Sequence, residues 1–164
     1  MFDFLKKNKK SVEKTLEIKN PIDGKVIRIE EVPDPVFAQK MVGDGFAVEP
    51  NSGIVKAPVS GEIVLQPDGL HACGIRTDEG IEVMVHFGTD TVELNGEGFS
   101  SEVNIGDYVE VGDVVLTVDI DLIREKVPSL VSPVIVTNPD ICTLSEVDIN
   151  AKQGETAQRA TLNE

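Results

Sequence analysis

Residues 70–87 read LHACGIRTDEGIEVMVHF, where two β-prone segments flank a polar, glycine-terminated TDEG segment typical of a hairpin turn. We expect Arg76 to pair with Ile81 across that turn, which places His71 directly opposite His86. Opposed residues of an antiparallel pair share a face, with Cβ atoms about 4.5–5.5 Å apart. Two imidazoles placed in this way can share a proton, a metal ion or a phosphoryl group. They are the only histidines of the chain, so this hairpin is the candidate site.

Alternation along the second segment of the hairpin predicts which face carries the two histidines. Its apolar face comprises Ile81, Val83, Val85 and Phe87. His86 therefore lies on the other face, with Met84, and we expect the pair at the surface or in a shallow depression. A single histidine in a strand is more often a packing residue, and a register shifted by one residue would send the two rings to opposite faces.

The rest of the chain alternates short apolar segments with Gly and Pro, a pattern typical of all-β folds. Strands are expected at 16–18, 24–29, 46–50, 53–55, 61–65, 70–76, 81–87, 108–111, 113–119, 134–136 and 157–162. The only helical segments expected are short turns at 35–41 and 122–126.

Two elements of the sequence are repeated. NPIDGKVI at 20–27 matches APVSGEIV at 57–64 in its Pro-x-x-Gly-x-aliphatic-aliphatic order. IGDYVEVGD at 105–113 carries a Gly-Asp element twice, and QGET at 153–156 echoes it. Glycines at such positions supply the positive φ that tight turns between strands need. We therefore predict an antiparallel β-sandwich with internally duplicated halves.

Composition and length indicate a single globular domain. The chain has 164 residues, 40% of them hydrophobic, and no tryptophan, so its core must rest on Val, Ile and Leu. Cys73 and Cys142 have neither metal nor redox spacing and indicate a reducing cytoplasm. No apolar segment approaches the ~20 residues of a membrane span, and no secretory signal is expected.

The charge is distributed unevenly. Residues 1–14 hold five lysines against two acidic residues, a net charge of +3, whereas the whole chain carries −14. We expect 1–14 to be a basic tail that is either a solvated segment or a contact with anionic membranes at the inner face of the cell membrane. Residues 15–164 form the acidic domain, which argues against a nucleic-acid partner and suits a partner with a basic docking patch.

Around His86 the sequence resembles a known family. EVMVHFGTDTVELNGEGF at 82–99 resembles the active-site stretch of the glucose-family enzyme IIA domain of the bacterial sugar phosphotransferase system, and VPDPVFAQKMVGDG at 32–45 resembles its upstream segment. The resemblance extends over nearly all of 16–162. It implies a phosphotransferase component, with no cofactor required. Such a protein takes a phosphoryl group from the histidine-containing phosphocarrier protein and passes it to a cysteine of the enzyme IIB domain of a glucose-type sugar permease.

The resemblance also implies roles for individual residues. His86 is the phosphorylated residue, the Gly88 carbonyl is the candidate acceptor for its second N–H, and His71 donates a hydrogen bond to the phosphoryl oxygens. Asp34 and Asp90 flank the site and would meet an arginine of a partner, or cap turns, or both; Asp90 also supports the phosphoryl group. The apolar docking ring comprises Val36, Phe37, Met41, Val42, Met84 and Val92.

One position departs from the family pattern. A threonine commonly stands two residues before the second histidine and orients it through a side-chain hydrogen bond. Here that position is Gly69. We therefore expect backbone or water to orient His71.

Two other functions remain open from the sequence. His86 and Asp90 have the His-x-x-x-Asp spacing of some zinc hydrolases, but a catalytic zinc needs three protein ligands and no third histidine exists. Zinc bridged by a partner protein at His71 and His86 is a further alternative. The domain could also be a regulatory module that docks onto transporters or kinases without transferring phosphate.

Overall fold

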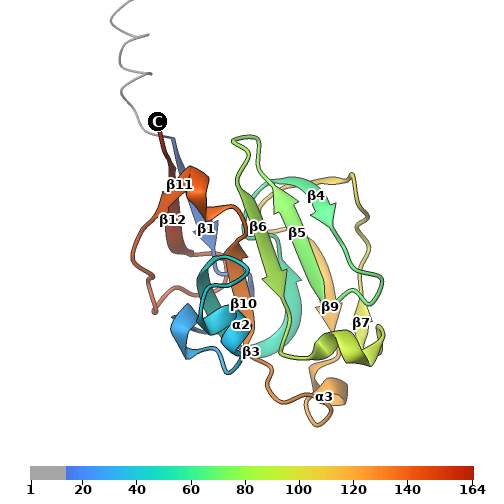
Figure 1. The fold of residues 1–164 in the computed structure, drawn as a ribbon. Coiled ribbons are helices and arrows are strands. Elements are labelled where there is room, and N and C mark those ends of the chain that lie inside the picture. Colours follow the sequence, from blue (N-terminus) through green and yellow to red (C-terminus); the bar gives the residue numbers. More distant parts are fainter. Residues whose placement is uncertain (1–13) are drawn as a thin grey trace, which may run out of the picture.

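The computed structural model describes residues 14–164, and its elements are almost all strands (Figure 1). The strands are β1 (Thr15–Lys19), β2 (Ile22–Arg28), β3 (Asp44–Lys56), β4 (Gly61–Leu65), β5 (Ala72–Arg76), β6 (Glu82–His86), β7 (Phe99–Ser100), β8 (Tyr108–Val109), β9 (Val114–Val118), β10 (Ser132–Val136), β11 (Cys142–Leu144) and β12 (Thr156–Leu162). The short helical elements are η1 (Ile29–Glu31), α2 (Pro35–Ala38), η2 (Thr91–Leu94), α3 (Ile120–Ile123) and η3 (Pro139–Ile141).

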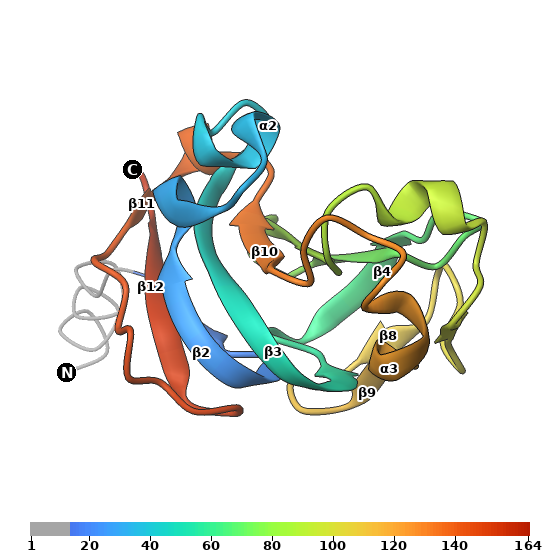
Figure 2. The ribbon, with the colours of Figure 1, turned by 90° about the horizontal axis from the view of Figure 1, so that it is seen from below.

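Within this described part of the chain the strands form two antiparallel sheets. The larger has nine strands in the order β7-β9-β3-β10-β6-β5-β4-β8, with β2 pairing onto β3, and the smaller has the order β1-β12-β11. β3 is the longest strand and pairs with β10 near its start, with β9 near its end and with β2 along most of its length. Because β3 bends as it changes partners, the large sheet is strongly curled (Figure 2). The predicted mostly-β antiparallel fold with only short helical turns is confirmed.

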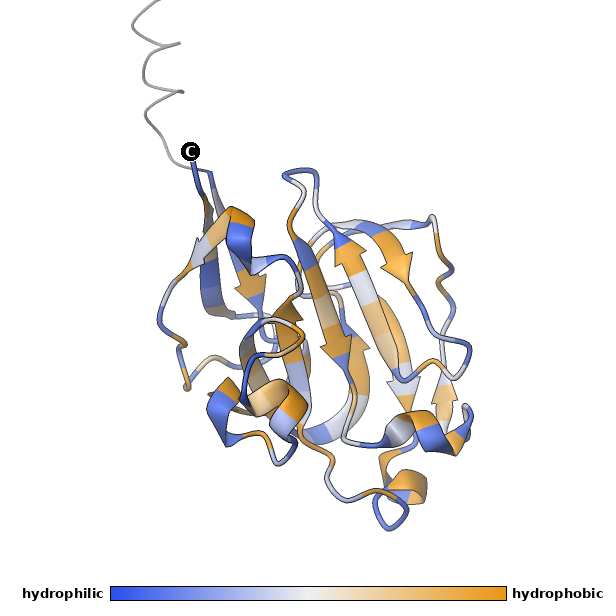
Figure 3. Ribbon diagram, in the orientation of Figure 1, coloured by the Kyte–Doolittle hydropathy of each residue, from blue (hydrophilic) through white to orange (hydrophobic). Residues whose placement is uncertain are grey.

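The core fills the inside of this curl. Buried residues alternate with half-buried ones along β6, and β10 is buried along its whole length. Both strands are mostly orange in Figure 3. The main cluster is built on Ile, Val, Leu and Ala around Phe46 and Phe87, as expected for a chain without tryptophan. A second, smaller cluster lies under α2 and comprises Ile27, Ile29, Val32, Phe37, Ala47 and Ile135.

The repeated sequence elements make equivalent hydrogen bonds. Lys19 N–H donates to the Pro58 carbonyl (3.0 Å), and Lys56 N–H donates to the Pro21 carbonyl (2.9 Å), so the two Pro-x-x-Gly segments bond to each other reciprocally. Lys19 and Lys56 stand directly before the two repeated segments, and Pro21 and Pro58 are the equivalent prolines within them.

The Gly-Asp turn at 112–113 and its Gly-Glu counterpart at 154–155 each bond to the residue that directly precedes a repeat proline. Asn20 exchanges two backbone hydrogen bonds with Gly154 and Glu155, just as Ala57 does with Gly112 and Asp113. Both glycines have positive φ (+88° and +94°), which a tight turn of this kind requires. The repeat therefore corresponds to two equivalent corners of the structure.

Several predicted element boundaries were wrong. The segments expected at 46–50 and 53–55 are one continuous strand, β3, and the helical turn expected at 122–126 is α3, which begins earlier because the Asp119 carboxylate accepts from the N–H of Leu122. The short strands β7 and β11 and the turn η2 were not predicted. Two or three residues are too few to show a period-2 pattern.

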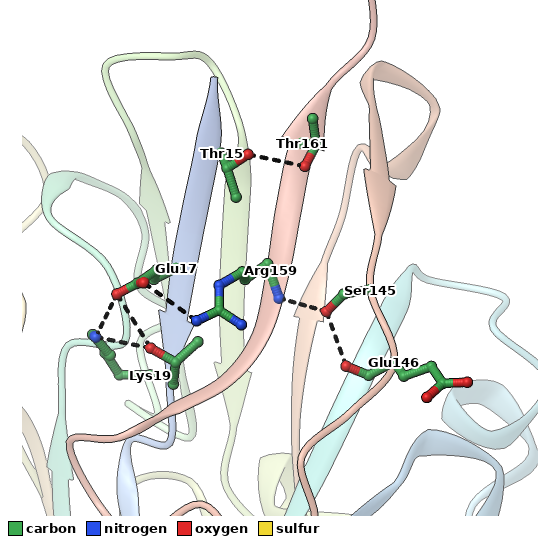
Figure 4. A network of polar contacts seen from close by, with 8 residues as sticks. Thr15, Glu17, Lys19, Ser145, Glu146, Arg159 and Thr161 are labelled. Carbon is green, nitrogen blue, oxygen red and sulfur yellow. Dashed lines mark hydrogen bonds and ion pairs between the residues drawn. The ribbon is translucent and has the colours of Figure 1, made fainter. Parts of the chain in front are cut away.

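The small sheet carries its polar contacts on an exposed face (Figure 4). Glu17 accepts from Lys19 Nζ (2.8 Å) and lies 3.5 Å from Arg159 Nη2, and the hydroxyls of Thr15 and Thr161 are 3.1 Å apart across β1 and β12. Hydrogen bonding to Lys19 is the main cause that lowers the pKa of Glu17. Ion pairs exposed to this degree contribute little to the free energy of folding. The register of β1 on β12 therefore depends on their main-chain hydrogen bonds.

No helix among residues 14–164 is long and apolar enough to cross a membrane. The basic tail predicted at 1–14 lies, apart from Lys14, outside the described residues.

The equivalent corners predict equivalent stability effects. Asp113 accepts from the N–H of Glu110, and Glu155 accepts from the N–H of Lys152, both at 2.9 Å. Replacing either by Ala should lower the free energy of unfolding by about 1 kcal/mol, because each capped N–H loses its side-chain acceptor. Urea denaturation of both variants measures this. Asp23→Ala, on the exposed edge of β2, is the control, and equal losses in all three variants would contradict the prediction.

Candidate functional site

The two histidine rings are in contact. His86 is the last residue of β6 and is half-buried, and His71 directly precedes β5 and is 8% exposed. Their ring centroids are 5.1 Å apart, and the ring planes meet at 71°. The end of β6 lies between α2 and the yellow-green turn η2 (Figure 1), so elements distant in sequence surround the pair.

The predicted register of the hairpin was wrong by one residue. Thr77 pairs with Ile81 instead of joining the loop, because Thr77 N–H donates to the Ile81 carbonyl and Ile81 N–H donates to the Thr77 hydroxyl. The loop is thus three residues long, and Ala72, not His71, lies opposite His86. Gly80 ends this loop with φ +90°.

The rings still meet because His71 lies outside the regular strand. Leu70 has the left-handed φ of +61°, which turns the chain immediately before β5, so strand alternation does not apply at His71. The His71 carbonyl accepts from the N–H of Phe87 (2.8 Å), which holds the turn against the end of β6. The predicted proximity of the histidines is confirmed, although the pairing from which it was inferred is not.

One hydrogen bond fixes the His86 ring. Nδ1 lies 2.9 Å from the Gly88 carbonyl oxygen, and since a carbonyl can only accept, Nδ1 carries the proton. Nε2 is therefore the nitrogen with the free lone pair. Gly88 has φ +71°, and a Cβ there would lie 2.9 Å from Thr91 Cγ2, so only glycine suits this turn.

Phe37, expected in the docking ring, packs on His86 instead of facing solvent. Its ring centroid lies 5.0 Å from that of His86, at a tilt of 54°, and it is only 6% exposed. At the end of the α2 loop, Lys40 Nζ lies 3.4 Å from Glu30 and 3.8 Å from Asp44, in ion pairs exposed to solvent.

Burial keeps both imidazoles neutral. Desolvation is the largest cause that lowers the pKa of His86, and the neighbouring His71 lowers it further, whereas the Gly88 hydrogen bond and the Asp34 charge oppose the shift. Burial likewise lowers the pKa of His71. Both rings are thus mostly uncharged at pH 7, which a nitrogen nucleophile requires.

The two flanking aspartates differ in what they do locally. Asp34 is half-buried and caps α2, since its carboxylate accepts from the N–H of Val36 (3.0 Å). Asp90 is exposed, has φ +57° and precedes η2 without a side-chain cap. The turn-capping alternative therefore holds for Asp34, and it coexists with a charge close enough to influence His86.

Four of the apolar residues expected to form the docking ring are exposed. They are Val36, Met41, Val42 and Val92, of which Met41 (68%) and Val92 (57%) are the most accessible. Met84 is half-buried on the same face of β6 as His86. Asp34 and Asp90 each stand two positions before one of these residues, Val36 and Val92, and exposed apolar side chains next to carboxylates suit a transient protein interface.

The site has no third metal ligand among residues 14–164. No group of three His, Cys, Asp or Glu side chains in this part of the chain could hold a metal ion. The zinc-hydrolase alternative therefore lacks the donor set that it needs.

The segment that holds Gly88 could not be recognised in the sequence. Gly88 N–H donates to the Ser132 hydroxyl (3.1 Å), and Thr89 N–H donates to the Ser129 carbonyl (3.0 Å). No local pattern indicates these bonds, because Ser129 and Ser132 are about forty positions further along the chain. Only the pairing of β10 with β6 brings them to the site.

His71 has an unsatisfied nitrogen next to Gly69. Its Nδ1 is buried and has no hydrogen-bond partner among the described residues. A Cβ on Gly69 would lie 3.5 Å from this Nδ1 and no closer than 3.4 Å to any other atom. Gly69 also lines a cavity of about 330 Å³ with His71, Val92 and Asn95. The main-chain partner expected to orient His71 in place of a threonine is therefore not found for Nδ1 among residues 14–164.

We predict that Gly69→Thr gives His71 a single dominant tautomer, because a hydroxyl on the new Cβ comes within reach of Nδ1. A hydrogen bond worth about 1 kcal/mol changes the tautomer ratio roughly five-fold. ¹⁵N chemical shifts of His71 measure the ratio. Gly69→Ala is the matched control, since it fills the same space without a hydroxyl. An equal shift in both variants, or none in either, would contradict the prediction.

Comparisons with known proteins agree on the family. Residues 16–141 match the family described as phosphoenolpyruvate-dependent sugar phosphotransferase system, EIIA 1. Over 139 residues the chain is 48% identical to the PTS system glucose-specific EIIA component of Halalkalibacterium halodurans, covering 84% of this chain and 80% of that protein. It is 42% identical to the Staphylococcus aureus protein of the same name, covering 95% of both.

A solved structure agrees in fold as well as in sequence. The glucose permease IIA from Mycoplasma capricolum superposes with a TM-score of 0.85 at 44% identity, covering 89% of this chain and 96% of that one. The chain belongs to the EIIA 1 family of the phosphoenolpyruvate-dependent sugar phosphotransferase system, and it is a phosphocarrier that relays phosphate from the histidine-containing phosphocarrier protein to enzyme IIB through a phosphohistidine intermediate.

Proposed function

We propose that His86 carries the phosphoryl group on Nε2. The observation that supports this most is the hydrogen bond from Nδ1 to the Gly88 carbonyl, which leaves Nε2 unprotonated. The Nε2 lone pair attacks the phosphorus of the donor phosphohistidine, and the donor P–N bond breaks with its electron pair returning to the donor ring. A thiolate of enzyme IIB then attacks phosphorus, and the electron pair of the P–Nε2 bond returns to His86.

His71 stabilises the phosphoryl oxygens while the group leaves His86 for the thiolate of enzyme IIB. Its Nδ1 lies against Gly69, so Nε2 is the nitrogen available to donate a hydrogen bond. The contact between the two rings brings that donor next to His86. A donor aimed at oxygens whose charge redistributes in the transition state acts most strongly in a partly desolvated site.

The surface around the histidines receives both partner proteins in turn. Val36, Met41, Val42 and Val92 are exposed there, and Met84 is half-exposed. Asp34 and Asp90 meet an arginine of the partner, and Asp90 supports the phosphoryl group from the η2 side. Phe37 contributes from beneath, through its packing on His86.

The permease that receives the phosphate is of the glucose type. This assignment rests on the names of the Halalkalibacterium and Staphylococcus relatives, both called glucose-specific. No cofactor takes part in the transfer. A zinc ion at this site would take two ligands from His71 and His86 and its remaining ligands from a partner protein.

The protein works in the cytoplasm beside the inner face of the membrane. Residues 1–14 support this proposal by their charge of +3 and by the apolar residues Phe2, Phe4 and Leu5. Such a tail binds anionic headgroups weakly and reversibly. Docking onto other proteins without transfer, the regulatory alternative, would use the same surface.

His86→Gln should abolish phosphate uptake from the histidine-containing phosphocarrier protein, because a glutamine amide is not a nucleophile and the His71 ring is centred 5.1 Å from the position of the His86 ring. Intact-mass analysis after incubation with phosphoenolpyruvate, enzyme I and the carrier checks this. The wild type should gain one acid-labile phosphoryl group. A stoichiometric phosphohistidine in the variant would overturn the assignment, and a wild type that binds its partners without gaining phosphate would favour the regulatory alternative.

His71→Gln should still accept phosphate but pass it to enzyme IIB about 10²–10³-fold more slowly, because the outgoing phosphoryl group loses its hydrogen-bond donor. Rapid-quench kinetics of the two half-reactions measure the effect separately. Equal slowing of both steps, or of neither, would make His71 a structural residue.

Removal of residues 1–14 should reduce binding to anionic vesicles in a salt-sensitive way while leaving phosphate uptake unchanged. Vesicle co-sedimentation at several salt concentrations tests this, with neutral phosphatidylcholine vesicles as the control. Equal binding by the full-length and shortened proteins would contradict a membrane role for the tail.

A further inference from the structure

We propose that Ser132 is a positioning residue for phosphoryl transfer, because its buried hydroxyl fixes the Gly88 main chain whose carbonyl holds the His86 ring. The inference rests on the proposed role of His86 as the phosphorylated residue. Ser132 is the first residue of β10 and is 0% exposed, so no partner protein can touch it. It acts on His86 only through Gly88.

The hydroxyl of Ser132 has a fixed orientation. Its oxygen accepts from Gly88 N–H at 3.1 Å, and its O–H donates to the Leu130 carbonyl at 2.8 Å. Both ends of the hydroxyl dipole are thus engaged, in a position closed to water. The strand that carries it is also fixed, since β10 pairs with β3 on one side and β6 on the other.

The next peptide unit is held from the same segment. Thr89 N–H donates to the Ser129 carbonyl at 3.0 Å, and the carbonyl of that same peptide unit belongs to Gly88 and accepts from His86 Nδ1. The imidazole N–H, the peptide unit and the Ser129 carbonyl therefore form a chain of aligned dipoles. Hydrogen bonds arranged in such a chain polarise and strengthen one another.

Gly88 needs this support because it is intrinsically free to rotate. Glycine adopts a φ of +71° at little cost, but it adopts several other backbone conformations just as readily. A bulkier residue cannot supply the rigidity, because a Cβ would lie 2.9 Å from Thr91 Cγ2 and 3.1 Å from the Ser129 carbonyl. Hydrogen bonds from outside the turn must fix it instead, and Ser132 is the side chain that provides one.

The chemical consequence concerns which nitrogen carries the proton. When Nε2 bonds to phosphorus, positive charge develops on the ring, while the Nδ1 proton stays in place and its bond to the Gly88 carbonyl strengthens. If the Gly88 carbonyl is free to turn away, part of the population carries its proton on Nε2. Those molecules have no lone pair with which to attack.

The experiment compares Ser132→Ala with Ser132→Thr, which keeps the hydroxyl, and with Thr77→Val as a matched control. Thr77 is 3% exposed and its hydroxyl accepts from Ile81 N–H at the far end of the same hairpin. Thr77→Val therefore removes a similar buried bond away from the site. The readouts are the His86 tautomer ratio from ¹⁵N shifts and single-turnover phosphorylation over a range of carrier concentrations.

Ser132→Ala should lower the maximal transfer rate by about 10-fold and reduce the Nδ1–H share of His86, with the half-saturating carrier concentration unchanged. Ser132→Thr should restore both values, and Thr77→Val should change neither. The inference is overturned if Ser132→Ala keeps the wild-type tautomer ratio and maximal rate. It is also overturned if the half-saturating concentration alone changes, because that would indicate a docking effect.

Two outcomes need their own measurements. If Ser132→Ala does not fold, Ser132→Cys replaces it, since a thiol of similar size is a much weaker acceptor; a tautomer ratio and rate equal to those of Ser132→Thr would then contradict the inference. Failure of the underlying function has a different signature. If His86→Gln still takes up phosphate, the assignment of His86 fails. The ¹⁵N tautomer ratio is measured in unphosphorylated protein, so it tests separately whether Ser132 acts on the His86 ring through Gly88.

Discussion

The hydrogen bond from His86 Nδ1 to the Gly88 carbonyl is the interaction on which the function proposed for this site depends. It spans only two residues, yet its geometry requires a left-handed glycine, a strand that ends at His86 and a buried surface that excludes competing water. Because the Gly88 carbonyl has no proton to donate, His86 Nδ1 must be the donor, and the bond defines one tautomer. In the proposed function, this main-chain contact gives the His86 imidazole one unprotonated nitrogen, Nε2, as the nucleophile.

The architecture brings the other requirements to the end of β6. The β5–β6 hairpin supplies His71, β10 and the segment before it hold the Gly88 turn, and the α2 loop covers the ring with Phe37. Each group lies on a different part of the chain, so the curled sheet is what assembles them. Burial then keeps both rings neutral, while the exposed apolar residues around them leave room for two successive partners.

Local signals were sufficient for the β fold, whereas the Gly88 acceptor came from the resemblance to the enzyme IIA family. The contact between the two histidines was predicted correctly, but from a hairpin register that is wrong by one residue. Alternation marked β6, and glycine and proline marked the turns. The register failed at Thr77, since its side chain competes with the main chain for Ile81 N–H, a choice that loop composition does not reveal. The burial of Phe37 and the position of Ser132 could not be predicted either, because both arise from contacts between elements distant in sequence.

The central claim is that the Nδ1–H tautomer directs phosphorylation to Nε2 of His86. The most direct measurement is ³¹P–¹⁵N coupling in the ¹⁵N-histidine-labelled, phosphorylated protein. The account predicts coupling to Nε2 of His86 alone, with the Nδ1 proton still bonded to the Gly88 carbonyl. Coupling to Nδ1 of His86, or to either nitrogen of His71, would contradict it.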